Sequence, residues 1–167
     1  MAIREIAVQR FSRTSKKSVP EVVAAMEKRI GRPDMATFRK QTTAAKNYAE
    51  LEQAINAAVG STGLMEFTRF DLGEILRKET GASSPHIVRL VIGNPLIMKR
   101  MVEYVPDAGS YAPVTILIDE REDGTHLSYD RMASFLAPYG NAQALQVAKD
   151  LDAKVEALLT AAAADDK

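Results

Sequence analysis

The chain has 167 residues, of which 46% are hydrophobic and 26% charged, and it contains no cysteine. The length and composition are typical of a single soluble globular domain and indicate neither disorder nor a fibrous repeat. The lack of cysteine excludes disulfides, thiolate metal sites, iron–sulfur clusters and a cysteine nucleophile.

Positive and negative charges balance, because lysine plus arginine and aspartate plus glutamate each number 22. No net field therefore attracts a polyanion or an acidic membrane surface, and we expect neither a nucleic-acid nor a membrane partner. Four basic residues do gather before the first expected helix, and we interpret them as a solvated connector rather than an RNA contact. They are Arg10, Arg13, Lys16 and Lys17.

Nothing near the N-terminus predicts a targeting signal. Charges interrupt residues 1–6, MAIREI, and no window of the chain holds the roughly eighteen apolar residues of a membrane span. A cytoplasmic location is the expectation that remains.

The first third of the chain predicts a strand and two helices. Residues 3–11 alternate imperfectly between apolar and polar side chains, as a strand does. A Ser18 and Glu21 capping box begins a helix up to Gly31, whereas residues 32–46 fit either a short strand or a turn of helix. Asn47 caps a second helix, which stops at Gly60.

Two strand–helix units follow. Residues 64–70 predict a strand that runs almost without a loop into a helix capped by Asp71 and ended by Gly81. Residues 87–92 are nearly continuous in branched apolar side chains, which predicts a central strand covered on both faces. A second helix is expected after Gly93-Asn94-Pro95.

Asp123-Gly124 between two strand-like runs predicts a β-hairpin with a two-residue type I′ turn. That turn would pair Arg121 with His126 and Asp119 with Ser128. One face of the hairpin is expected in the core: Ile116, Ile118, Leu127 and Tyr129. The other face carries Thr115, Leu117, Asp119, Arg121, His126 and Ser128.

A last helix, capped by Asn141, closes an α/β chain. Its strand–helix–strand units predict partly parallel pairing and the hairpin adds antiparallel strands, so we expect one mixed sheet with helices packed on it. We divide the chain into an N-terminal elaboration (1–46), packed on the same domain, a main domain (47–163) and a frayed tail (164–167).

Residues 93–130 contain the Gly93-Asn94-Pro95 triplet, the segment 112–118 (APVTILI), the acidic turn at 120–124 and the segment 127–130 (LSYD). With these features they resemble the family catalogued as domain of unknown function 302. More loosely it covers residues 47–160, whereas residues 1–46 resemble no known family. It implies a small α/β domain with a curved sheet, of the kind grouped with TATA-binding-protein-like folds, and self-association as a homodimer. It implies no reaction and no cofactor.

The Gly93-Asn94-Pro95 triplet is the first candidate site. Its structural explanation is complete: a turn at Gly93, an N-cap at Asn94 and a proline in the first helical turn. A helix N-terminus can also hold an anion, so Gly93, Asn94, Leu96 and Ile97 are candidate ligand-binding residues.

His126, with Asp119 and Ser128 on one hairpin face, is the candidate for catalysis as a general base. Alternate charged positions are equally typical of a solvated strand, and no Gly-x-Ser-x-Gly motif accompanies them. A metal site would need His86 and His126 to converge with Asp119 or Asp130, and we expect none.

Leu117 interrupts the polar hairpin face. With Met98 and Met101 it could form a partner surface or an apolar pocket, and core packing under another helix is the alternative. Our leading hypothesis is a non-enzymatic, self-associating module that binds a small anionic or apolar ligand or a protein partner. The alternative is a hydrolase or isomerase that uses His126 and Asp119.

Overall fold

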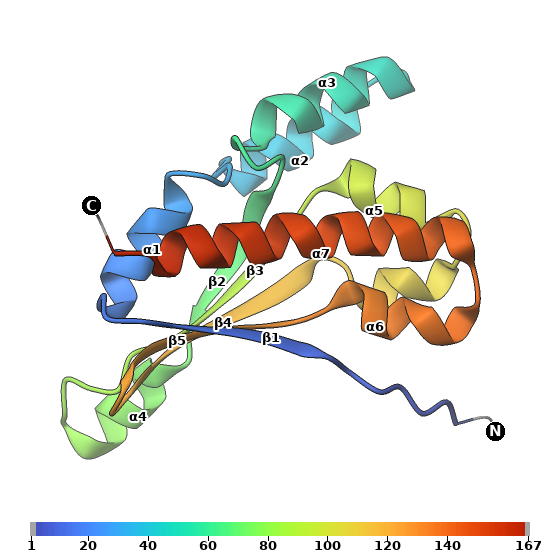
Figure 1. Cartoon of the computed structure of the whole chain (residues 1–167). Coiled ribbons are helices and arrows are strands. Elements are labelled where there is room, and N and C mark those ends of the chain that lie inside the picture. The colour runs from blue at the N-terminus through green and yellow to red at the C-terminus, as the bar shows by residue number, and fades with distance from the viewer. Residues whose placement is uncertain (1–2, 166–167) are drawn as a thin grey trace.

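The structure, a computed structural model, describes residues 3–165. It contains one five-stranded sheet in the order β1-β5-β4-β3-β2, with helices packed against it (Figure 1). The strands are β1 (Arg10–Ser15), β2 (Met65–Asp71), β3 (Ile87–Gly93), β4 (Val114–Arg121) and β5 (Gly124–Asp130). The helices are α1 (Val19–Glu27), α2 (Met35–Ala44), α3 (Tyr48–Ala58), α4 (Gly73–Thr80), α5 (Pro95–Val102), α6 (Met132–Leu136) and α7 (Ala142–Ala163), with 3-10 turns η1 (Pro106–Ser110) and η2 (Ala137–Tyr139).

All neighbouring strands of the sheet are antiparallel, which corrects the expectation of a mixed sheet. A parallel neighbour requires a connection that runs back along the sheet before the next strand begins. Here α4 lies beyond one end of the sheet (Figure 1), and β3 starts at the end where β2 stopped. The expectation of a single sheet in an α/β chain is confirmed. Antiparallel neighbours need only connections that begin and finish at the same end of the sheet.

One face of the sheet is packed and the other is largely open. Helices α1 and α7 lie against the packed face, with α5 beside α7. Leu90 and Ile92 of β3 are buried there, whereas Arg89 on the opposite face is exposed and Val91 is half-buried. The prediction that β3 is covered on both faces is therefore wrong, because branched residues also occupy its half-exposed positions.

The β4–β5 hairpin keeps the predicted faces but not the predicted register. Ile116, Ile118, Leu127 and Tyr129 are buried, as expected. Arg121 pairs with Gly124 instead of His126, so Glu122 and Asp123 form the turn. Gly124 has a φ of 134°, and a Cβ there would lie 2.6 Å from the Ser15 carbonyl oxygen. A glycine at this position therefore allows the close approach of β5 to β1.

The N-terminal region differs from the expected one in two places. The first strand lies at Arg10–Ser15, at the edge of the sheet against β5, rather than at residues 3–11. The segment left open at 32–46 contains α2, whose N-cap Asp34 accepts the Thr37 amide at 2.8 Å. Helices α2 and α3 lie side by side (Figure 1), and a second small core joins them to β2 through Phe38, Ile55 and Met65.

The predicted caps are confirmed except at α4, where Leu72 takes the N-cap position and Asp71, one residue earlier, accepts the Glu74 amide at 3.0 Å. Ser18 and Glu21 form the capping box of α1, which ends at Glu27, earlier than expected. Asn47 and Asn141 each accept an amide at the start of α3 and α7. Ala164 and Asp165 of the expected frayed tail follow the end of α7, and residues 166–167 lie outside the described chain.

Candidate functional site

Asn94 links the end of β3 to the start of α5. Its Oδ1 atom accepts the Leu96 amide at 2.8 Å, and its backbone carbonyl accepts the amides of Ile97 and Met98 at 3.1 and 3.0 Å. Its Nδ2 atom donates to the Gly63 carbonyl at 2.9 Å. Asn94 therefore closes the helix start and also fixes the loop before β2.

This cap leaves no free amide for an anion among residues 95–98. Pro95 has no N–H, and the amides of the next three residues already have acceptors within the cap. The dipole of α5 remains, but the hydrogen bonds that usually hold a phosphate or carboxylate at such a site are occupied. The geometry favours the apolar over the anionic ligand that the sequence allowed.

An apolar pocket of about 140 Å³ lies beside the triplet, between α5, α7 and the start of β4. The side chains and backbone that line it are mainly apolar, and Asn94 stands at its polar end. We call it the Asn94 pocket; its lining residues are Phe67, Gly93, Asn94, Pro95, Ile97, Met98, Met101, Ala112, Pro113, Val114 and Leu151. Of the four predicted ligand residues, Gly93, Asn94 and Ile97 line it.

The fourth predicted residue, Leu96, points elsewhere and packs against the small core formed by Phe38, Ile55 and Met65. This follows from helical geometry, because adjacent positions on α5 lie about 100° apart around the axis. One face of α5 therefore lines the pocket, and another holds the α2–α3 pair.

Two backbone features shape the Asn94 pocket. The register between β2 and β3 shifts between Glu66 and Thr68, so Phe67 stands outside the regular ladder and reaches the pocket. Gly93 carries no side chain; a Cβ there would lie 3.3 Å from Pro113 Cβ and 3.5 Å from Phe67 Cε2. Such a Cβ would narrow the pocket between these two residues.

The catalytic candidates share one face of the hairpin but do not bond to one another. Asp119 and His126 are direct cross-strand neighbours, while Ser128 lies opposite Leu117. The His126 ring nitrogen Nε2 lies 2.7 Å from Asp123 Oδ1, and Asp119 pairs with Arg121. The His126 contact lowers the pKa of Asp123. The carboxylate that contacts His126 is thus that of Asp123, which the sequence analysis assigned only to the turn.

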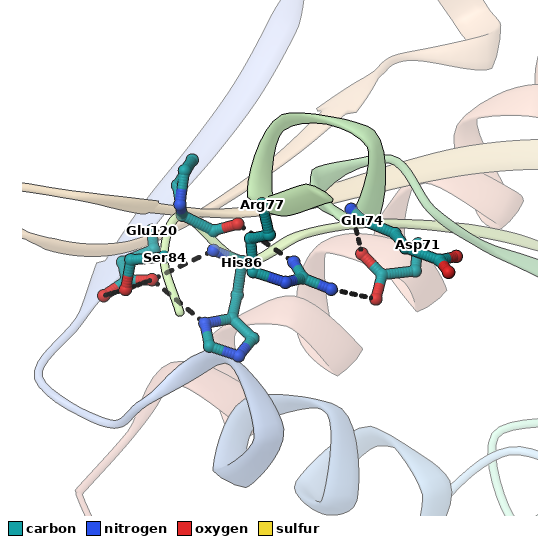
Figure 2. A network of polar contacts seen from close by, with 7 residues as sticks. Asp71, Glu74, Arg77, Ser84, His86 and Glu120 are labelled. Atoms are coloured by element: carbon teal, nitrogen blue, oxygen red, sulfur yellow. Dashed lines mark hydrogen bonds and ion pairs between the residues drawn. The ribbon is translucent and has the colours of Figure 1, made fainter. Parts of the chain in front are cut away.

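A second polar network lies where α4 meets the sheet (Figure 2). Arg77 donates to Asp71 Oδ2 at 2.6 Å and to the Pro85 carbonyl at 3.0 Å. His86 binds Glu120 through its backbone amide at 3.0 Å and places Nδ1 3.1 Å from the same carboxylate. The His86 amide is the main reason that the pKa of Glu120 is lowered. These contacts close the loop between α4 and β3.

The His86 ring thus contacts the Glu120 carboxylate, and the His126 ring contacts that of Asp123. Among residues 3–165, no three histidine, aspartate or glutamate side chains group as metal ligands would. In the same part of the chain, no helix has the length and apolar character needed to cross a membrane.

Leu117 does not join Met98 and Met101, contrary to one expectation from the sequence. The two methionines line the Asn94 pocket on the packed side, whereas Leu117 lines a separate hollow on the open side of the sheet. Alternation along β4 explains the separation, since Leu117 points away from Ile116 and Ile118. Sequence reasoning also missed Phe67 and Leu151, which reach the pocket only through a bulge and a long-range helix contact.

The sequence profile of the family described as "Domain of unknown function DUF302" matches residues 38–162. No protein with a curated description matches the chain. Among solved structures, the chain is similar to the crystal structure of an uncharacterised conserved DUF302 protein from Bacillus stearothermophilus. The TM-score is 0.63 at 14% identity, over 92% of this chain and 97% of that one, which shows a shared fold. The chain belongs to the DUF302 family.

Proposed function

We propose that the protein binds a small apolar ligand in the Asn94 pocket. The observation that carries the proposal is the apolar lining of this half-open space of about 140 Å³ next to the helix cap. An engineered apolar cavity of about 150 Å³ in another protein stays dry and binds benzene, so a space of this size suits a ligand with one ring or a short alkyl chain.

The lining supports the proposal in two further ways. Met98 and Met101 present flexible, polarizable side chains, which adapt to ligands of different shape. The Nδ2 and Oδ1 atoms of Asn94 are both engaged with the protein, so Asn94 shapes the rim rather than offering a free hydrogen bond. Binding would therefore come from burial of apolar surface.

Toluene is a suitable probe. We expect saturable shifts of the Met98 and Met101 methyl resonances during a toluene titration of the full chain followed by NMR. Gly93→Ala should weaken binding, because the added Cβ lies between Pro113 and Phe67. Gly109→Ala is the matched control, since a Cβ at Gly109 meets only Val102 Cγ1, at 3.8 Å. Shifts that never saturate, or equal binding by both variants, would contradict the proposal.

We further propose that the chain self-associates through α4. Four of the eight most exposed large apolar side chains of residues 3–165 lie within the seven positions 70–76, at the end of β2 and the start of α4, and their exposed fractions run from 40% to 74%. They are Phe70, Leu72, Ile75 and Leu76, here named the α4 patch. Because α4 projects beyond the sheet (Figure 1) and the chain carries no net charge, two copies can approach there without long-range repulsion.

Light scattering tests the self-association. We expect a mass near twice 18.3 kDa for the natural chain and near 18.3 kDa for Ile75→Lys, which places a charge on the most exposed residue of the α4 patch. Tyr104→Lys, at another exposed aromatic residue, is the control that should leave the mass unchanged. A natural chain of 18.3 kDa at high concentration would exclude the homodimer.

A further inference from the structure

The open side of the sheet carries a second hollow that differs from the Asn94 pocket in its chemistry. It measures about 410 Å³, with strands β1, β5, β4 and β3 as its floor and η1 and α6 as its wall. Pro113 and Val114 line both spaces and separate them. We call this hollow the Arg89 pocket.

Arg89 is the distinctive group on the floor. Its neighbours on the adjacent strands are Phe70 and Leu117, neither of which carries a charge. The only hydrogen bond of its guanidinium to residues 3–165 is a long one of 3.4 Å to Thr115 Oγ1, and within the same residues it has no ion pair. A guanidinium has five donors, so most of the donors of Arg89 remain available to a ligand.

The other charges of the Arg89 pocket cancel. Arg10 binds Asp130 through two hydrogen bonds of 2.6 and 2.9 Å, and this contact raises the pKa of Arg10 and lowers that of Asp130. Both residues line the pocket with Arg89. Two cations and one anion leave one positive charge, which belongs to Arg89.

The wall of the Arg89 pocket is aromatic and its floor also offers hydroxyl groups. Tyr111 and Phe135 stack with ring centroids 4.7 Å apart, and both line the pocket opposite the strands. Leu117 adds an apolar side chain on the floor, beside the hydroxyls of Thr115 and Ser128. The pocket thus combines one unpaired guanidinium with a partly apolar surface.

We propose that the Arg89 pocket binds an aromatic carboxylate. Arg89 would hold the carboxylate through paired N–H donors, the geometry for which arginine is best suited. The hydroxyl of Thr115 or Ser128 would donate to the remaining lone pairs, and the ring would lie against Leu117, Tyr111 and Phe135. This site is independent of the apolar site proposed above, because the ligand-contacting residues differ.

The test is an NMR titration of the full chain with benzoate, with benzamide as the neutral isostere and acetate as the anion without a ring. We expect saturable benzoate shifts at the amides of Arg89, Thr115 and Ser128. Benzamide should bind at least about tenfold more weakly, because it lacks the charge that pairs with the guanidinium. Acetate should also bind more weakly than benzoate, since it leaves the aromatic wall uncovered.

Arg89→Gln should weaken benzoate binding by at least about tenfold, while Arg39→Gln, at an exposed arginine on α2, should not. Benzoate shifts without saturation, equal binding of benzoate and benzamide, equal binding of benzoate and acetate, or an unchanged Arg89→Gln variant would each overturn the proposal. If Arg89→Gln fails to fold, the comparison of the three compounds on the natural chain decides. None of these results bears on the proposal that toluene binds in the Asn94 pocket, which has its own test.

Discussion

The Tyr129 hydroxyl donates a 2.7 Å hydrogen bond to Oδ1 of Asp152, a carboxylate with no exposed surface. The same oxygen accepts the Met132 amide at 2.7 Å, and Oδ2 accepts the Ala133 amide at 3.1 Å. Arg131 Nε lies 3.7 Å from Oδ2. Asp152 of α7 therefore joins the end of β5 to the start of α6. Burial of the Tyr129 hydroxyl, and next the negative charge of Asp152 beside it, raise the pKa of Tyr129.

Asp152→Ala should lower the free energy of unfolding by about 3–5 kcal/mol, because it removes the acceptor of three donors in a buried or part-buried setting. Arg131 keeps Glu156 as its nearer carboxylate, at 2.8 Å. Tyr129→Phe removes the bond to Asp152 and a longer one of 3.2 Å from the Met132 amide, but that amide keeps Asp152 as its acceptor, so the change should cost only about 1 kcal/mol. Urea unfolding of both variants measures the difference. Equal losses would show that Asp152 does not organise the junction.

Asn94→Ala should cost about 2 kcal/mol, of which about 1 comes from the cap of α5 and about 1 from the hydrogen bond to the Gly63 carbonyl. Asn94→Ser can still cap the helix but cannot reach Gly63, so it should lose only about 1 kcal/mol. Chemical denaturation of the two variants separates the contributions. Serine and alanine variants of the same stability would mean that the cap contributes nothing.

Gly60→Ala should lower the free energy of unfolding by about 3 kcal/mol, because a Cβ at this position would lie 2.4 Å from both the Arg29 oxygen and the Ile30 carbonyl carbon. These are backbone atoms, which cannot move aside as a flexible side chain does. Thermal unfolding measures the effect, and Gly109→Ala, where a Cβ makes only an ordinary contact with Val102 Cγ1 at 3.8 Å, is the control. A Gly60→Ala variant as stable as the control would contradict the close approach of the two segments.

The contact between Arg77 and Asp71 predicts a pH dependence. The Arg77 hydrogen bond lowers the pKa of Asp71 in the folded chain (Figure 2). The stabilisation is therefore complete above the ordinary aspartate pKa of about 3.9 and is lost as the pH falls through the lower folded value. An NMR titration of the Asp71 carboxyl carbon should show this low midpoint, and Arg77→Gln should raise it.

Arg39→Gln serves as the control for that titration, because Arg39 lies on α2, away from the contacts of Asp71. Its Asp71 midpoint should match the natural chain. An Asp71 carboxyl that titrates at the same pH with and without Arg77 would refute the assigned cause.

Local signals predicted most elements of the fold. Caps at Ser18, Asn47 and Asn141 mark helix starts because their side chains satisfy amides within the next three residues, so the information is local. The inward alternation of Ile116 and Ile118 likewise needs only the period of a strand. The antiparallel order was not predictable in this way, because amphipathic helices do not reveal at which end of the sheet the chain returns.

The candidate site was only partly predictable for the same reason. Gly93, Asn94 and Ile97 are contiguous with the cap and were identified from it, whereas Phe67 and Leu151 come from distant segments. The hairpin register depended on whether Gly124 lies inside the turn or begins β5. In the structure Gly124 begins β5 and lies against the Ser15 carbonyl, which is more than one hundred positions earlier in the chain.

The most direct test of the Asn94 pocket is a crystal structure of the full chain under xenon pressure, because xenon enters dry apolar cavities and scatters strongly. We predict a xenon atom between Phe67, Met98 and Leu151, with lower occupancy in Gly93→Ala. Ordered water in hydrogen bonds at that position, with no xenon, would contradict the account of an apolar ligand site.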